Sequence, residues 1–128
     1  MANEFVKPTE AELEILHVLW AYGAQSVRFV NDKLNEQRDP SVGYTSTLKT
    51  MQVMHEKGLV ARDDSARSHI YAAAMPQTET QRNLVKNFVD SAFKGSAMQL
   101  VMQALGNHEA SDSELAEIKA LIEQMEKK

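Results

Sequence analysis

Hydrophobic residues in the first part of the chain recur every three or four positions, which is the spacing of helices that bury one face. The first of these helices starts at Thr9, and Glu12 three positions later completes the sequence pattern of a capping box. Gly23 ends this helix, and Ser26 is the N-cap of a short second one. A third helix follows at about 44–57. The pattern therefore predicts three helices in succession.

The third helix is predicted to end in a Schellman motif, with Gly58 at the C′ position and Leu59 folded back on Met54. With a turn of about 100° per residue, the residues expected to face the core are Tyr44, Leu48, Met51 and Met54. Those expected to face outward are Thr45, Ser46, Lys49, Thr50 and Val53. Short hydroxyl side chains on this outer face are unusual, because threonine forms helices poorly and solvated helices normally carry Glu and Lys.

Two short runs of β type follow, "LVARDD" at 59–64 and "SHIYAA" at 68–73, and the residues between them are predicted to form the tip of a hairpin. The order of helix, helix, helix and hairpin is that of a winged helix-turn-helix. We assign residues 1–75 to this domain. The predicted fold is mainly α, with three helices and a two-stranded wing at the N-terminus and a helical dimerisation domain after them.

The remainder, 76–128, is predicted to be that helical domain. Capping-box patterns at Thr78–Gln81 and Ser111–Glu114 open the first and the last of its three helices, and Gly95-Ser96 separates the first from the second. The apolar residues of the last helix step by three, four and three positions, a narrow stripe of coiled-coil type. Short helices with one apolar side are marginal alone in water, so we expect a second copy of the chain to cover them. The expected dimer contacts are Phe88, Val101, Leu115, Ile118, Ile122 and Met125.

Composition excludes several classes of function. The chain has no cysteine, which removes disulfides and thiol metal sites, and its four histidines lack ligand spacing. It also lacks a Gly-rich phosphate loop and a nucleophile elbow, so we expect no enzyme activity, no metal and no cofactor. No apolar run approaches the roughly 20 residues that cross a bilayer. We therefore expect a cytoplasmic protein without membrane insertion.

Short hydroxyl groups and one lysine on the third helix suit a DNA major groove, where they can contact bases or phosphates. Arg62 and Arg67 flank the tip of the hairpin and could lie over the phosphate backbone, although Asp63 and Asp64 reduce its positive charge. The net charge of −4 means that any basic surface must be local. Two alternatives remain open: a helix merely exposed to water, and a winged-helix module that binds protein and never DNA.

The chain resembles the penicillinase repressor family of bacterial transcriptional regulators. The matching stretches are "PTEAELEILHVLW", "YTSTLKTMQVMHEKGLV", "RSHIYAA" and "GSAMQLVMQAL". The resemblance implies a homodimeric repressor whose winged helix reads a dyad operator in double-stranded DNA. It implies that the operator-facing residues are Thr45, Ser46, Lys49, Thr50 and Gln52, with Arg67 on the wing.

The resemblance also implies a way of leaving DNA. Members of the family are commonly released when a membrane sensor triggers proteolysis within the C-terminal domain. The penicillinase branch is cut at an Asn-Phe bond, and the matching residues here are Gln103 and Ala104, which makes them the candidate release site. The copper-responsive branch uses C-terminal cysteines, which this chain lacks. A membrane sensor or protease is therefore an expected partner beside the operator and the second copy.

Overall fold

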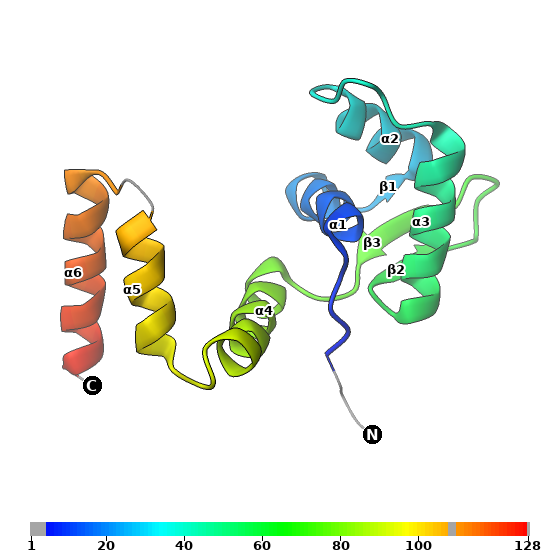
Figure 1. Ribbon diagram of the computed structural model, residues 1–128. Coiled ribbons are helices and arrows are strands. Elements are labelled where there is room, and N and C mark those ends of the chain that lie inside the picture. The colour runs from blue at the N-terminus through cyan, green and yellow to red at the C-terminus, as the bar shows by residue number, and fades with distance from the viewer. Residues whose placement is uncertain (1–4, 108–109, 128) are drawn as a thin grey trace. The chain divides into compact units, whose positions relative to one another are not determined.

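A computed structural model describes residues 5–107 and 110–127 and shows a mostly helical fold with one small sheet (Figure 1). In chain order the elements are α1 (Glu10–Tyr22), β1 (Gln25–Ser26), α2 (Val27–Asn35), α3 (Tyr44–Lys57), β2 (Val60–Asp63), β3 (Ile70–Ala73), α4 (Gln77–Ala92), α5 (Ala97–Asn107) and α6 (Asp112–Glu126). The chain divides into two compact units, Met1–Leu84 and Val85–Lys128, which we call the N-terminal and C-terminal units. The division falls inside α4, and the domain boundary expected after residue 75 stays a prediction.

The N-terminal unit is a winged helix-turn-helix, in which α1, α2 and α3 pack around one apolar core that two strands complete. The buried residues of this core are Ile15, Leu16, Leu19, Val27, Val30, Met51, Met54, Val60 and Tyr71. Burial of each large side chain contributes about 1.5–3 kcal/mol. The mainly α fold with an N-terminal winged helix, predicted from the apolar spacing, is confirmed.

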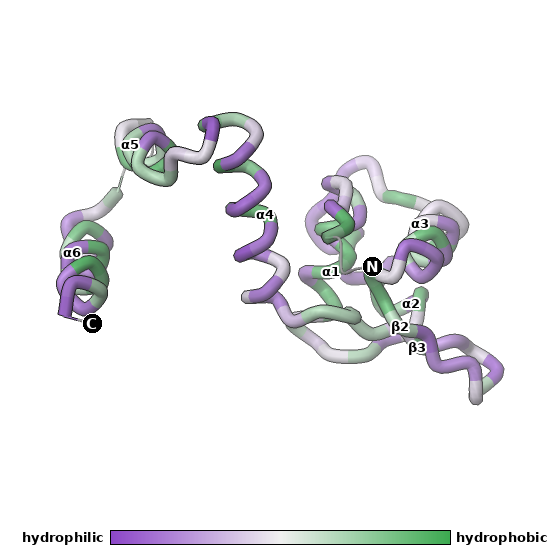
Figure 2. Tube along the Cα trace, turned by 90° about the horizontal axis from the view of Figure 1, so that it is seen from below, coloured by the Kyte–Doolittle hydropathy of each residue, from purple (hydrophilic) through white to green (hydrophobic). Residues whose placement is uncertain are grey.

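The sheet has three antiparallel strands in the order β1-β3-β2, one more than the predicted hairpin. The hairpin of β2 and β3 pairs Val60 with Ala73 and Asp63 with Ile70, and β1 adds to its other edge through Gln25 opposite Tyr71. A strand of two residues has no alternation that a sequence pattern could reveal. We call β2, β3 and the loop between them (60–73) the wing. Its loop projects from the unit in both views and is mainly hydrophilic at the tip (Figures 1 and 2).

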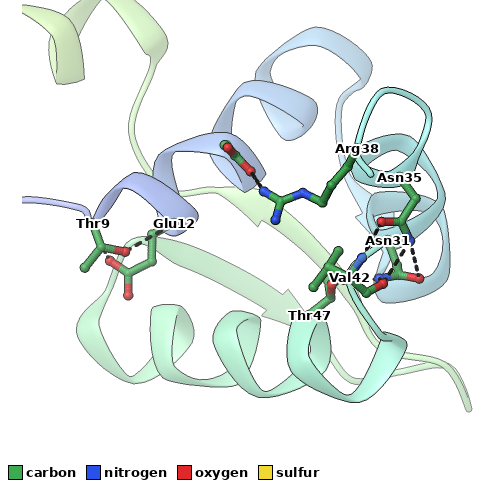
Figure 3. Close-up of polar contacts among 8 residues, drawn as sticks. Thr9, Glu12, Asn31, Asn35, Arg38, Val42 and Thr47 are labelled. Atoms are coloured by element: carbon green, nitrogen blue, oxygen red, sulfur yellow. Dashed lines mark hydrogen bonds and ion pairs between the residues drawn. The ribbon is translucent and has the colours of Figure 1, made fainter. Parts of the chain in front are cut away.

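Local capping fixes the ends of these helices as the sequence predicts. At the start of α1, the Thr9 hydroxyl accepts the Glu12 N–H at 3.1 Å, and the Glu12 carboxylate accepts the Thr9 N–H at 2.9 Å (Figure 3). At the end of α3, Gly58 has φ 85°, and the Leu59 N–H donates to the Met54 carbonyl at 2.9 Å. The predicted capping box and Schellman end are both confirmed.

Glu12 also ties α1 to the end of α3. The Lys57 ammonium lies 2.7 Å from the Glu12 carboxylate, which is almost completely buried. Burial alone would raise the pKa of Glu12, but hydrogen bonds from Lys57 and from the Thr9 N–H together hold this pKa below its ordinary value of 4.5.

The C-terminal unit has little apolar burial of its own. Gly95 with φ 88° follows α4, and the Ser96 hydroxyl accepts the Gln99 N–H at 3.1 Å, so the predicted break is confirmed. At the start of α4, which belongs to the N-terminal unit, the Thr78 cap is wrong, because the helix begins at Gln77 and the Thr80 N–H donates to the Pro76 carbonyl at 3.0 Å. Hydrophobic segments recur along α5 and α6 (Figure 2). The large apolar side chains that stay exposed in this unit are Val85, Phe88, Met98, Val101, Met102, Leu105, Leu115, Leu121, Ile122 and Met125.

Two further classes of feature are missing from the described ranges 5–107 and 110–127. No helix there is long and apolar enough to span a bilayer. No group of three or more metal-ligating side chains comes together there.

Candidate nucleic-acid interface

Helix α3 presents the polar face that its sequence predicts, except that Thr47 rather than Tyr44 is buried. Thr45, Ser46, Lys49 and Gln52 are exposed, while Thr50 is half-buried. Tyr44, predicted to face inward, is instead 38% exposed, so that prediction is wrong. Tyr44 is the first residue of α3, and a helical side chain leans toward the turn before its own Cα, which here lies beyond the core.

Thr47 takes the inward position and is 2% exposed. Its hydroxyl accepts a hydrogen bond of 2.8 Å from the side-chain amide of Asn31 on α2, so its oxygen is buried without a penalty. Of the three threonines in this helix, one therefore serves the fold.

A polar network around Asn31 and Asn35 sets the position of α3 relative to α2 (Figure 3). The Asn31 and Asn35 amides donate to the Val42 carbonyl at 3.1 and 2.9 Å, and the Val42 N–H donates to the Asn35 amide oxygen at 2.7 Å. Together with the Asn31–Thr47 bond, these contacts hold both the loop before α3 and its first turn. The exposed face of α3 is thus presented on a fixed support.

Thr50 has one of its hydrogen-bonding capacities already in use. Its hydroxyl donates to the Ser46 carbonyl at 2.9 Å, one turn earlier on the same helix. The remaining lone pairs can accept from a base amino group, and the methyl group can contact a thymine methyl.

The acidic residues of the wing are engaged within the wing itself. Asp63 accepts the Ser65 N–H at 2.9 Å and shapes the turn; this bond lowers its pKa. Asp64 pairs with the Arg62 guanidinium at 2.7 Å and lies 3.7 Å from His69. Arg62 is therefore committed first to the hairpin. Arg67 is exposed and has no carboxylate partner among the described residues.

Ion pairs within the N-terminal unit engage four of the nine basic side chains that the structure describes there. Four basic side chains pair with carboxylates: Lys33 with Glu36, Arg38 with Glu14, Lys57 with Glu12 and Arg62 with Asp64. Within the described part of the unit, the basic residues without such a partner are Lys7, Arg28, Lys49, Arg67 and Arg82. Three of these lie on α2, α3 and the wing, the elements that a winged helix brings to DNA.

Sequence reasoning missed Arg28, whose guanidinium carbon lies 4.5 Å from the centre of the Tyr44 ring. A signal was available, because Arg28 occupies the first turn of α2, where the helix dipole disfavours a cation. It also missed Asn31 and Asn35, which no local pattern distinguishes from ordinary polar residues of a short helix.

Most residues predicted for the dimer contact are exposed in the part of the chain that the structure describes. Phe88, Val101, Leu115, Ile122 and Met125 are exposed, and Ile118 is half-buried. Ile118 lines an apolar groove of about 640 Å³ together with Phe88, Phe93 and Leu100. Gln103 and Ala104, the candidate release site, lie within α5 and line the same groove.

The fold and the polar face of α3 define a winged-helix protein. The chain belongs to the penicillinase repressor family, whose family model matches residues 8–124. This membership supports a role in transcription regulation rather than catalysis.

Individual relatives are distant but match over nearly their whole length. The chain is 23% identical over 122 residues to the methicillin resistance regulatory protein MecI of Mammaliicoccus sciuri, covering 95% of this chain and 98% of that protein. It is 21% identical over 128 residues to the penicillinase repressor of Staphylococcus aureus, covering 100% of both chains. Among solved structures it is similar to a cysteine-to-serine mutant of ZitR from Lactococcus lactis, with a TM-score of 0.41 and 16% identity over 99% of this chain and 79% of that one.

Proposed function

We propose that this protein is a homodimeric transcriptional repressor that binds a dyad operator in double-stranded DNA, acting in the cytoplasm. The observation that carries the proposal is the exposed hydroxyl-rich face of α3, next to cations that no carboxylate of the described residues neutralises. Such a face in the third helix of a winged helix suits the major groove. Family membership supports the same function.

Within this proposal, α3 reads the operator. Thr45, Ser46, Lys49, Thr50 and Gln52 face the bases and the adjoining phosphates. Lys49 can contact a guanine or a phosphate, because its ammonium has three donors and no intramolecular ion pair among the described residues. Arg67 contacts the phosphate backbone from the wing. Arg62 also contacts the phosphate backbone, but its guanidinium is shared with Asp64.

The proposed dimer forms through the C-terminal unit. Its contacts are Phe88, Val101, Leu115, Ile118, Ile122 and Met125, most of which are exposed in a single chain. Several large apolar side chains on short helices need cover, and a second copy supplies a matching stripe. A dimer with two α3 helices also explains why an operator would be a dyad.

Release from the operator would follow cleavage between Gln103 and Ala104, triggered by a membrane sensor or protease. Because both residues lie within α5, a protease could accept this bond only after the helix unwinds locally.

Selection from a pool of random duplexes with the full-length protein tests the proposal. We expect enrichment of one sequence with dyad symmetry, and binding that weakens steeply between about 50 and 200 mM salt. An absence of retention on DNA at low salt would refute it. That result would favour a winged-helix module that binds protein, an alternative that the net charge of −4 favours.

A further inference from the structure

Arg28 and Tyr44 form a contact between α2 and α3 at the edge of the candidate interface. The guanidinium lies over the tyrosine ring, 4.5 Å from its centre, and both residues are exposed. Arg28 is the second residue of α2 and Tyr44 is the first residue of α3. The contact therefore joins the N-terminal ends of the two helices of the helix-turn-helix.

The contact with the ring leaves the N–H donors of Arg28 available, because it engages the guanidinium through its π face. Stacking on an aromatic ring engages the flat face of a guanidinium, whereas its five N–H donors point outward in the same plane. No carboxylate of the described residues pairs with them. A fixed planar fork of donors matches an anion with several oxygens, above all a phosphate group.

The position of Arg28 is unfavourable for the helix that carries it. A cation in the first turn of a helix opposes the dipole of that helix, and no acidic residue in this turn offsets it. The contact with the Tyr44 ring offsets part of this cost in the free protein. The arrangement is favourable once an anion binds beside it.

We propose that Arg28, oriented by Tyr44, is a second phosphate-binding residue of each protomer, contacting the operator backbone next to the N-terminal end of α3. The inference rests on the proposed function, since the phosphate belongs to the DNA. Arg28 touches the ligand, and Tyr44 is a positioning residue that holds the guanidinium through its ring. Because a phosphate carries no sequence information, this pair sets the register of α3 and adds affinity without choosing bases.

The test compares two arginines in the full-length protein. Arg28→Ala removes the proposed contact. Arg82→Ala is the matched control, because Arg82 is also exposed and also lacks a carboxylate partner in the described part of the chain, but lies on α4. Binding to a mixed-sequence duplex is measured across a salt series, together with thermal melting of each variant.

For Arg28→Ala we expect affinity at 0.1 M salt to fall about five- to tenfold per protomer, and the salt slope to decrease by about one per protomer. Arg82→Ala should leave the slope unchanged. Melting of Arg28→Ala should change little, because the relief of a cation opposing the α2 dipole and the loss of its contact with the Tyr44 ring act in opposite directions. The preference for a selected operator over a scrambled duplex should also be unchanged.

Two variants of Tyr44 test its positioning role. Tyr44→Phe keeps the aromatic face and should keep wild-type affinity and slope. Tyr44→Leu keeps apolar bulk without the ring and should lose part of the affinity that Arg28→Ala loses, with little further loss when the two changes are combined.

The result of the experiment distinguishes a failure of this inference from a failure of the proposed function. If Arg28→Ala binds like wild type while Lys49→Ala and Arg67→Ala bind more weakly, the inference is wrong and the proposed function stands. If Arg82→Ala weakens binding as much as Arg28→Ala, the effect is one of overall charge and the inference is again wrong. If the wild-type protein itself shows no salt-dependent binding, the proposed function is what fails.

Discussion

Two threonines on α3, two positions apart, should separate folding from DNA binding. Thr47 is buried and accepts the Asn31 amide at 2.8 Å, whereas Thr45 is exposed on the face proposed to read bases. Replacement of each by valine conserves shape and β-branching and exchanges only the hydroxyl group for a methyl group. The two variants therefore differ in where that oxygen lies and in little else.

The structure sets the magnitude for Thr47→Val. Asn31 is 5% exposed and keeps its 3.1 Å bond to the Val42 carbonyl, so the variant leaves one buried N–H without a partner. Leaving a buried donor unsatisfied costs about 1–3 kcal/mol, and valine leaves no cavity that would add to it. Thr45→Val should change the free energy of unfolding by less than about 0.5 kcal/mol, as for most surface substitutions.

Urea unfolding followed by fluorescence measures this difference. Trp20 is the only tryptophan of the chain and reports on the N-terminal unit, where its indole N–H donates to the Met75 carbonyl at 3.0 Å. The second measurement is the affinity of each variant for the selected operator and for a scrambled duplex. Thr45→Val should lose about 1–3 kcal/mol of operator affinity if a base contact is removed, with little change for the scrambled duplex.

Thr47→Ser is the control, because it keeps the hydroxyl and loses only a methyl group. An unfolding free energy for Thr47→Val equal to that of wild type would refute the reasoning about the Asn31 bond. A Thr45→Val variant that melts early but still prefers the operator would show that the outer hydroxyls are structural.

Three other predictions concern the wing, the dimer contact and the acid stability of the fold. Arg67→Ala should weaken operator and scrambled binding by similar factors, with a salt slope lower by about one per protomer; a changed base preference would contradict the phosphate role. Ile118→Asp should place an unpaired charge in the proposed dimer contact at a cost of several kcal/mol, so light scattering should show monomers, and an unchanged dimer would count against this contact. Because hydrogen bonds hold the pKa of Glu12 below 4.5 despite burial, its contribution is present above that pH and is lost as the pH falls through the lowered value. The difference in unfolding free energy between wild type and Glu12→Gln should therefore shrink on acidification, and a constant difference would exclude this linkage.

Helix ends were predictable because the signals that set them are local. Thr9 with Glu12, and Gly58 with Leu59, determine their own hydrogen bonds from residues a few positions apart, and the structure matches both. The Thr78 cap was wrong, because α4 begins at Gln77 and Thr78 lies inside its first turn.

Side-chain choices across elements were not predictable in the same way. Tyr44 and Thr47 lie on the same side of α3 by periodicity, and the hydrogen bond that satisfies the buried Thr47 hydroxyl comes from Asn31, sixteen residues earlier in the chain. The sequence also left open whether the acidic residues at the tip of the wing would repel DNA. The structure shows that Asp64 pairs with Arg62 and that Asp63 accepts a backbone N–H. Residue type gives the chemistry that is available, and tertiary contacts decide which groups remain free to act.

The pairing of cations within the N-terminal unit also affects how such a repressor would distribute itself over a genome. A bacterial chromosome offers millions of competing sites, and affinity for them comes almost entirely from phosphate contacts. Because Lys33, Arg38, Lys57 and Arg62 are already bound to carboxylates, this chain has less positive charge available for arbitrary DNA than its number of basic residues suggests. A larger share of the molecules would remain in free solution, and the operator would compete for them against weaker background binding. Few copies per cell could then keep the operator occupied, with fewer of the long sliding searches that more basic proteins make.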